Sequence, residues 1–201
     1  MKDKPYFAVV YMFVVTAFFS TVLIGFSRLT RQRVEANEQL AFERAVLAVF
    51  SDISAESNTD IHRIFVEQFV KTPQMGGAYL YYKDRQLAGY VIPVEGQGFW
   101  APIKGVVGLA LDKRTITGIS FYEQSETPGL GARIVEEDFC SQFVGKMISQ
   151  SGKPIGIKPS SETLQENQVH SITGATQTCI RLEKLMNEGL SGWLRSVEGQ
   201  P

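Results

Sequence analysis

The sequence is poor in the residues that form metal and thiol sites. It has two cysteines and two histidines among 201 residues. Cys140 and Cys179 lie far apart and form neither a CxxC pair nor a zinc-ligand spacing. This argues against zinc, an iron–sulfur cluster or a redox thiol pair held by this chain alone. Two interpretations stay open for the cysteines: small buried residues, or a disulfide in an oxidising compartment.

The chain also lacks concentrated positive charge and the motifs of hydrolases. It has 20 Lys and Arg against 21 Asp and Glu, a formal net charge of −1, and no basic stripe. Nucleic acid is therefore not expected as a partner. The absence of a GxxxxGK[ST] loop disfavours an ATPase. No Ser–His–Asp, paired-carboxylate or metal-triad spacing supports an autonomous hydrolase.

Charge is missing altogether from one long run near the N-terminus. No charged residue occurs from Tyr6 to Phe26, and a helix of that length rises roughly 31 Å, which matches the hydrocarbon core of a bilayer. The run is too long for a signal peptide, and no small-x-small cleavage site follows Phe26. We therefore predict an uncleaved transmembrane anchor over residues 1–27, followed by a helical connector over residues 28–75.

The charges beside this run give a conflicting signal about orientation. Lys2 and Lys4 precede it, whereas Arg28, Arg31 and Arg33 follow it. The positive-inside count places the following domain in the cytoplasm, but the rule weakens when a long domain follows the span. Charge alone therefore leaves the orientation open.

The hydrophobic periodicity beyond the run predicts an α+β domain over residues 76–201. Aromatic and β-branched runs separated by turn residues predict two hairpins, so an antiparallel sheet is expected with helices against it. The predicted strands are 78–83, 87–94, 106–111 and 115–122, with short strands at 155–157 and 168–169. Apolar residues at helical spacing predict helices at 27–50, 61–69, 136–149 and from residue 176 onward.

Three loops of this domain have the composition of a cofactor site. The first, residues 173–176, precedes the last predicted helix. Its small residues let a ligand approach the backbone, and the free amide groups of a helix start favour a phosphate. The alternative is plain N-capping by Thr173 or Ser171.

The other two loops follow predicted strands. In residues 125–131, Pro128 and Gly129 fit the central positions of a type II turn, and Gly131 extends a loop whose amides can reach a planar ring. An ordinary tight turn is the alternative. In residues 96–100, two glycines precede two aromatic residues, and Trp100 either stacks on a ligand or fills the core.

These loops resemble a known family. The string Glu-Thr-Pro-Gly-Leu-Gly at 126–131, the Gly-x-Gly-x-Trp stretch at 96–100 and the string Ser-Ile-Thr-Gly-Ala-Thr at 171–176 are similar to the FMN-binding domain of flavin subunits of the Na⁺-translocating NADH:quinone oxidoreductase and the Rnf complex. The order of the three loops and the single N-terminal span agree, and the resemblance covers nearly the whole chain. Residues 122–124, Tyr-Glu-Gln, favour the sodium-pump type.

The resemblance implies an electron-carrying subunit of such a complex, with other membrane subunits and a flavin transferase as partners. It implies FMN linked through a phosphoester to Thr176, on a domain outside the cytoplasmic (inner) membrane, against the positive-inside count. The implied cofactor-binding residues are Thr176 as the attachment residue, with Thr173, Gly174, Ala175, Thr178, Glu126, Thr127, Pro128, Gly129, Leu130, Gly131, Gly98 and Trp100.

One position departs from the family pattern. His170 stands where the attachment motif has an acidic residue, and a neutral imidazole cannot replace a carboxylate at a hard cation. Three alternatives to a covalently flavinylated subunit therefore stay open. They are a subunit with dissociable FMN, a free-standing anchored FMN relay to extracytoplasmic acceptors, and a flavin-free assembly subunit.

Overall fold

The computed structural model describes residues 5–198, so Lys2 and Lys4 of the orientation count lie outside the described residues. The chain divides into two units, residues 1–39 and 40–201. The first unit is formed by most of helix α1, Pro5–Ala48, which joins both predicted N-terminal helices into one. By length and composition α1 is able to cross a membrane. Its large apolar side chains from Tyr6 to Phe26 are mainly exposed.

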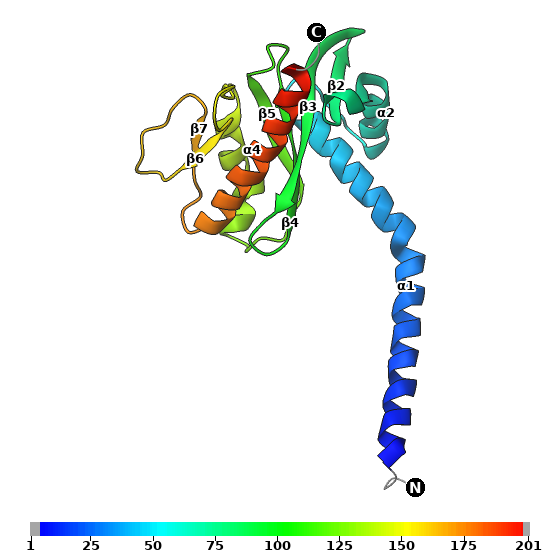
Figure 1. The fold of residues 1–201 in the computed structure, drawn as a ribbon. Coiled ribbons are helices and arrows are strands. Elements are labelled where there is room, and N and C mark those ends of the chain that lie inside the picture. The colour runs from blue at the N-terminus through cyan, green and yellow to red at the C-terminus, as the bar shows by residue number, and fades with distance from the viewer. Residues whose placement is uncertain (1–4, 199–201) are drawn as a thin grey trace. The chain divides into compact units, whose positions relative to one another are not determined.

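The second unit is built on a five-stranded antiparallel sheet whose strands follow chain order (Figure 1). Both predicted hairpins are confirmed, and Asp84 and Arg85 turn the first of them with positive φ angles of 50° and 65°. The strands are β1 Phe69–Thr72, β2 Ala78–Lys83, β3 Gln86–Gln97, β4 Pro102–Leu109 and β5 Ile116–Glu123.

Strand β1 was not predicted from the sequence. Its apolar residues continue the helical spacing of the preceding segment, but helix α2, Asn58–Gln68, ends before Phe69. The chain then pairs with β2, with Val70 opposite Leu80. Backbone pairing with an existing sheet edge therefore overrides the local helical pattern.

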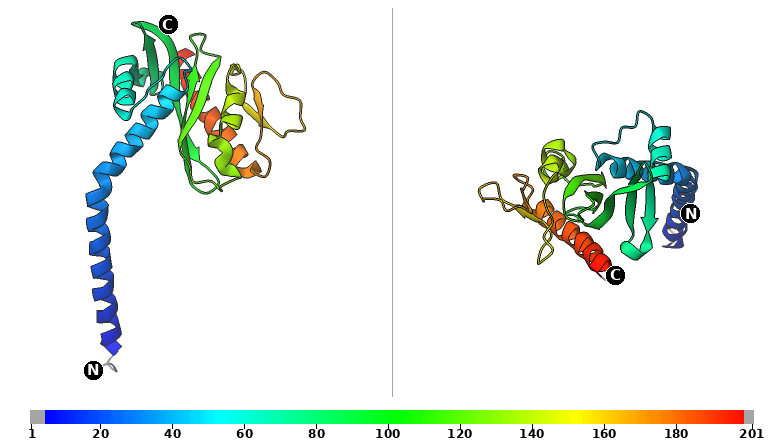
Figure 2. Two further views of the ribbon diagram at one scale, coloured as in Figure 1. Left: turned by 180° about the vertical axis from the view of Figure 1, so that it is seen from behind. Right: turned by 90° about the horizontal axis from the view of Figure 1, so that it is seen from above.

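Side chains alternate between the two faces of the sheet and form two cores. On one face, Tyr90 and Ile92 of β3 join the buried residues of α4, Thr176–Glu198. On the other face, Val91 joins the end of α1 and helix α2. Figure 2 shows α4 running along its face of the sheet from two further directions. The sequence predicts that this helix begins at residue 176. The packing of its apolar residues on the sheet fixes the position of that first residue.

Glycines let the chain after α1 lie flat on the second face. Gly108 and Gly118 are opposite each other on β4 and β5. A Cβ at Gly118 would lie 3.0 Å from both the Cα and the carbonyl oxygen of Val49, and one at Gly108 would lie 2.8 Å from the Val49 Cγ2. The sheet surface must therefore lack side chains where residue 49 crosses it.

The predicted helix over residues 136–149 is wrong. Only α3, Glu137–Cys140, and a 3₁₀ turn, Ser141–Phe143, are helical there. The chain then reverses at Gly145, whose φ is 76°, and pairs with the start of β5. The Gly145 amide donates to the Ile116 carbonyl at 2.8 Å, and the Ile116 amide donates to the Lys146 carbonyl at 2.8 Å. These bonds satisfy the sheet edge and exclude a helix.

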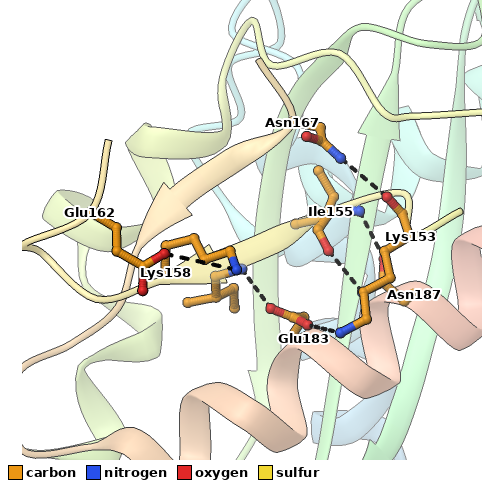
Figure 3. Close-up of polar contacts among 8 residues, drawn as sticks. Lys153, Ile155, Lys158, Glu162, Asn167, Glu183 and Asn187 are labelled. Atoms are coloured by element: carbon orange, nitrogen blue, oxygen red, sulfur yellow. Dashed lines mark hydrogen bonds and ion pairs between the residues drawn. The ribbon is translucent and has the colours of Figure 1, made fainter. Parts of the chain in front are cut away.

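The two short predicted strands are confirmed as a parallel pair, β6 Gly156–Lys158 and β7 Gln168–His170. Side chains of α4 close the outer edge of β6 (Figure 3). Asn187 accepts from the Ile155 amide and donates to its carbonyl, both at 2.8 Å. Glu183 accepts from the Ile157 amide and from Lys153, both at 2.7 Å. The pair is therefore attached to the helix that begins at Thr176.

The glycine contact under Val49 predicts a stability effect. We expect Gly118→Ala to lower the free energy of unfolding by roughly 1–3 kcal/mol, because the added methyl group meets backbone atoms that cannot move aside easily. Denaturant unfolding of the full chain in detergent measures this change.

Gly192→Ala is the matched control. A Cβ there meets nothing within 4 Å, on a helix, so it is expected to be neutral or to stabilise by up to about 1 kcal/mol. If Gly118→Ala and Gly192→Ala changed the free energy of unfolding equally, the close contact at Gly118 would be contradicted.

Candidate cofactor site

The three candidate loops meet at one cavity of about 230 Å³. The loops come from the ends of β3 and β5 and from the segment between β7 and α4, so the sheet and its helix bring together segments far apart in sequence. The cavity is lined by Phe99, Thr127, Leu130, Gly131, Gly174, Ala175, Thr176, Gln177 and Thr178.

The start of α4 forms one wall with free backbone donors. The Ala175 and Cys179 amides donate within the turn, to Ile172 and Ala175. In the described part of the chain, no acceptor is bonded to the amides of residues 176–178, and no side chain of Thr173 or Ser171 caps the helix. The capping interpretation is therefore wrong. No acidic residue occupies the first turn, so the helix start favours an anion.

The loop after β5 forms the opposite wall through a tight turn. The Leu130 amide donates to the Thr127 carbonyl at 3.1 Å, and Gly129 has a φ of 73°, so the predicted turn is confirmed. Thr127 and Leu130 face the cavity, whereas Pro128 and Gly129 are exposed at the tip and do not line it.

Glu126 fastens its own loop to the loop at residues 96–100 and to the first turn of α4. Its side chain is 5% exposed. One carboxylate oxygen accepts from the Phe99 and Trp100 amides at 2.8 and 3.2 Å, and the other accepts from the Thr178 hydroxyl at 2.6 Å. Charge-assisted bonds of this kind are strong. Glu126 thus positions the cavity wall and does not line the cavity.

Three glycines keep the loops close and the cavity open. A Cβ at Gly98 would lie 2.5 Å from the Glu126 carboxylate, and one at Gly131 would collide with the Thr178 hydroxyl. Gly174 has a φ of 81°, and its Cβ would lie 3.0 Å from Leu130. Any side chain at these positions would displace the Glu126 contacts or fill the space.

Exposed aromatic residues form the rim. Trp100 is 65% exposed, so the interpretation of this residue as core is wrong. Its indole N–H donates to the Thr127 hydroxyl at 3.0 Å, and its ring meets Phe99 edge-on at 4.9 Å. Phe99 and Leu130 are 43% and 42% exposed beside the cavity. This rim offers apolar faces to a planar ring. Thr173 is exposed and lies outside the cavity lining.

Two wall residues, Phe99 and Gln177, were not among the predicted cofactor residues. Both adjoin predicted ones in sequence, Phe99 beside Trp100 and Gln177 beside Thr176. Sequence spacing alone does not tell which neighbour points inward. Helical geometry at residues 176–178 places Gln177 on the wall, and the amide contact to Glu126 fixes Phe99.

His170 ends strand β7 and does not line the cavity. Its backbone amide donates to the Gln142 side chain at 2.9 Å. Its ring Nδ1 is buried, with no hydrogen-bond partner among the described residues. The position that departs from the family pattern is therefore held by strand pairing, outside the cavity lining.

The thiols take no part in the cavity wall. Both cysteines are free, so the disulfide interpretation is wrong. Burial raises the pKa of Cys140 to about 11. Burial also raises the pKa of Cys179, partly offset by the hydrogen bond from the Ile172 amide. Both thiols are thus protonated and unreactive near neutral pH. Within residues 5–198 no cluster of three metal-binding side chains occurs.

A comparison with known families finds one match, over the part of the chain that forms the cavity. Residues 98–191 match the model of the FMN-binding domain family. This segment contains the residues of all three loops, except residues 96 and 97 at the beginning of the loop at residues 96–100. Residues 98–191 are thus similar to an FMN-binding domain, and FMN is the cofactor that this similarity indicates.

Relatives point to a particular kind of subunit. The chain is similar to the NqrC subunit of the Na⁺-translocating NADH-quinone reductase of Vibrio anguillarum, with 31% identity over 114 residues. The match covers 55% of this chain and 45% of the relative. The chain therefore spans about half the length of the curated relatives it matches.

Solved structures share the fold. The NqrC subunit of the Na⁺-translocating NADH-quinone reductase from Parabacteroides distasonis has a TM-score of 0.69 at 23% identity, covering 85% of this chain and 98% of that one. NqrC of Shewanella oneidensis has a TM-score of 0.63 at 20% identity, covering 83% of this chain and all of that one. The predicted α+β class is confirmed.

The groups on the wall fit FMN. Free amides at the start of a helix suit a phosphate, and the exposed rim suits the isoalloxazine ring. A volume of about 230 Å³ is below the 300–1,000 Å³ usual for pockets that enclose a ligand. The cavity would therefore enclose part of FMN and leave the remainder against the rim.

The Glu126 contacts predict a stability effect. We expect Glu126→Ala to cost roughly 1–3 kcal/mol for each donor left buried without an acceptor. The unfolding free energy of the full chain in detergent measures it, and the fluorescence of the exposed Trp100 should change as its loop is released.

Glu123→Ala is the matched control. Glu123 pairs with Lys104 at 2.6 Å, with both side chains about one-third exposed or more. Its loss is expected to cost about 0–1 kcal/mol. A Glu126→Ala variant as stable as Glu123→Ala would show that the three contacts do not fasten the loops.

Proposed function

We propose that this chain is the membrane-anchored flavin subunit of a complex of the Na⁺-translocating NADH-quinone reductase type, in which it carries FMN and passes electrons. The observation that carries the proposal is the convergence of the three loops on one cavity that joins a free helix start to an aromatic rim. The similarity to NqrC favours the sodium-pump type over the Rnf type.

Within this function the residues in and around the cavity have different tasks. The amides of residues 176–178 bind the phosphate, and Phe99, Leu130 and Trp100 provide apolar contacts for the ring. Glu126, Gly98 and Gly131 hold the loops at their distance. Thr127, Pro128 and Gly129 form the turn that carries Leu130, while Thr173, Gly174 and Ala175 lead the chain into the helix.

FMN supplies the one- and two-electron chemistry, and the protein supplies position and electrostatics. The cavity walls leave the ring side open, because Phe99, Trp100 and Leu130 are all exposed. An accessible ring edge suits a carrier that must receive electrons from one partner and deliver them to another. The adjoining membrane subunits are the proposed partners.

Covalent attachment at Thr176 is part of the proposal. Thr176 is exposed, is the first residue of α4 and lines the cavity. Its hydroxyl therefore lies where a phosphate bound by the helix start would be. A flavin transferase would form the phosphoester, adding the mass of one FMN less water.

The remaining proposals concern the membrane. Residues 1–27 form the anchor in the cytoplasmic (inner) membrane, residues 28–75 connect it, and residues 76–201 are the FMN-binding domain on the extracytoplasmic side. The uncharged run of α1 supports the anchor. The orientation follows from the resemblance, since a long domain can be translocated despite the arginines after the span.

Covalent attachment predicts a specific loss of flavin. Full-length chain expressed in membranes with a flavin transferase should give a fluorescent band after denaturation and a mass increase of one FMN less water. Thr176→Ala should lose both completely, because the substitution removes the oxygen atom of the phosphoester.

Thr173→Ala is the matched control, since Thr173 lies in the same loop but outside the cavity lining, and it should stay fluorescent. His170→Asp restores the acidic residue of the family motif. If the wild type is dark and His170→Asp is fluorescent, the histidine prevents attachment. If both are dark while native protein holds FMN, the cofactor is dissociable and the phosphoester is disproved.

The orientation predicts where the C-terminus lies. A C-terminal fusion to alkaline phosphatase, which folds only outside the cytoplasm, should be active, and the matching fusion to green fluorescent protein should be dark. The long domain after the span makes this outcome compatible with Arg28, Arg31 and Arg33. A bright fluorescent fusion with an inactive phosphatase would place the domain in the cytoplasm.

A further inference from the structure

Arg181 lies beside the cavity, is half-buried and has no carboxylate partner among the described residues. Its Nε atom is buried and has no hydrogen-bond partner among the described residues. Its guanidinium carbon lies 6.0 Å from the centroid of the Phe99 ring, over the ring. No carboxylate in the described part of the chain forms an ion pair with it.

Two neighbouring lysines, in contrast, form ion pairs with carboxylates of α4. Lys184 of the same helix lies 3.7 Å from Glu188. Lys153, before strand β6, lies 2.7 Å from Glu183 of that helix. Removing a charge from water without a counter-charge is unfavourable. An unpaired, partly buried guanidinium therefore marks a place where an anion would be stabilised.

The position of Arg181 relates this charge to the cavity. Arg181 follows Gln177 by four residues and Thr178 by three, and residues so spaced are neighbours on a helix surface. Gln177, Thr178 and Phe99 all line the cavity. Arg181 thus flanks the wall that these three residues form.

The backbone of Arg181 lies beyond the helix start that faces the phosphate. It lies five residues beyond Thr176, which is about 7.5 Å along the helix axis. The free amides of the helix start lie at the opposite end of that interval. The guanidinium lies over the ring of Phe99, one of the two aromatic residues of the rim.

We propose that Arg181 stabilises the negative charge that the isoalloxazine ring of FMN gains on reduction, and so raises the midpoint potential of the bound flavin. The inference rests on the proposed function. Arginine keeps its positive charge at all physiological pH values. Its attraction to a nearby anion is strengthened by partial burial, and this favours the reduced cofactor over the oxidised one.

Potentiometric titration of the FMN-loaded full chain in detergent tests this role in Arg181→Gln, Arg181→Lys and Lys184→Gln. In Arg181→Gln the ratio of reduced to oxidised flavin at fixed potential should fall about tenfold, equivalent to about 59 mV for one electron. Arg181→Lys keeps the charge and should retain most of the potential. Lys184→Gln removes an exposed charge one turn away on the helix and should change the flavin potential little.

Flavin content and thermal unfolding of each variant separate the explanations. Full FMN loading with an unchanged potential in Arg181→Gln would overturn the inference and leave the proposed function intact. If Arg181→Gln binds less FMN but the flavin potential is unchanged, Arg181 acts on the phosphate. That result would also overturn the inference. A wild-type chain that holds no FMN would overturn both proposals.

Discussion

The buried carboxylate of Glu126 is the contact on which the geometry of the site depends. It accepts two backbone amides from the loop at residues 98–100 and the hydroxyl of Thr178. A carboxylate removed from water must have its oxygens satisfied, so these loops cannot separate without a large penalty. Gly98 and Gly131 are required because a Cβ at either position would enter this contact.

Helix α4 connects that contact to the rest of the domain. Its apolar face packs on the sheet through residues such as Leu182, Met186 and Leu190. Its first turn provides free amides to the cavity. Its other side closes the edge of β6 through Glu183 and Asn187. A single rigid element therefore sets the position of Thr176, the attachment of the small parallel pair and the placement of Arg181.

Local patterns predicted most of the elements because their signals are confined to a few residues. The Asp84–Arg85 turn and the alternating strands beside it specify a hairpin wherever it lies. The helix expected over residues 136–149 failed because Gly145 and the open edge of β5 offered backbone pairing that helical spacing cannot reveal. Strand β1 was missed for the same reason: Phe69 fits a helical pattern, yet pairing with β2 satisfies its backbone.

Composition and local backbone preference are enough to specify the uncharged run of α1, the α+β class, the turn at Gly129 and the three loops of the site. Other properties became visible only in the folded chain: Glu126 fastens the walls, Phe99 and Gln177 line the cavity, Trp100 is exposed, and Arg181 has no carboxylate partner among the described residues. These properties depend on distances between segments remote in sequence. Such distances are fixed when the sheet and α4 bury their apolar faces together.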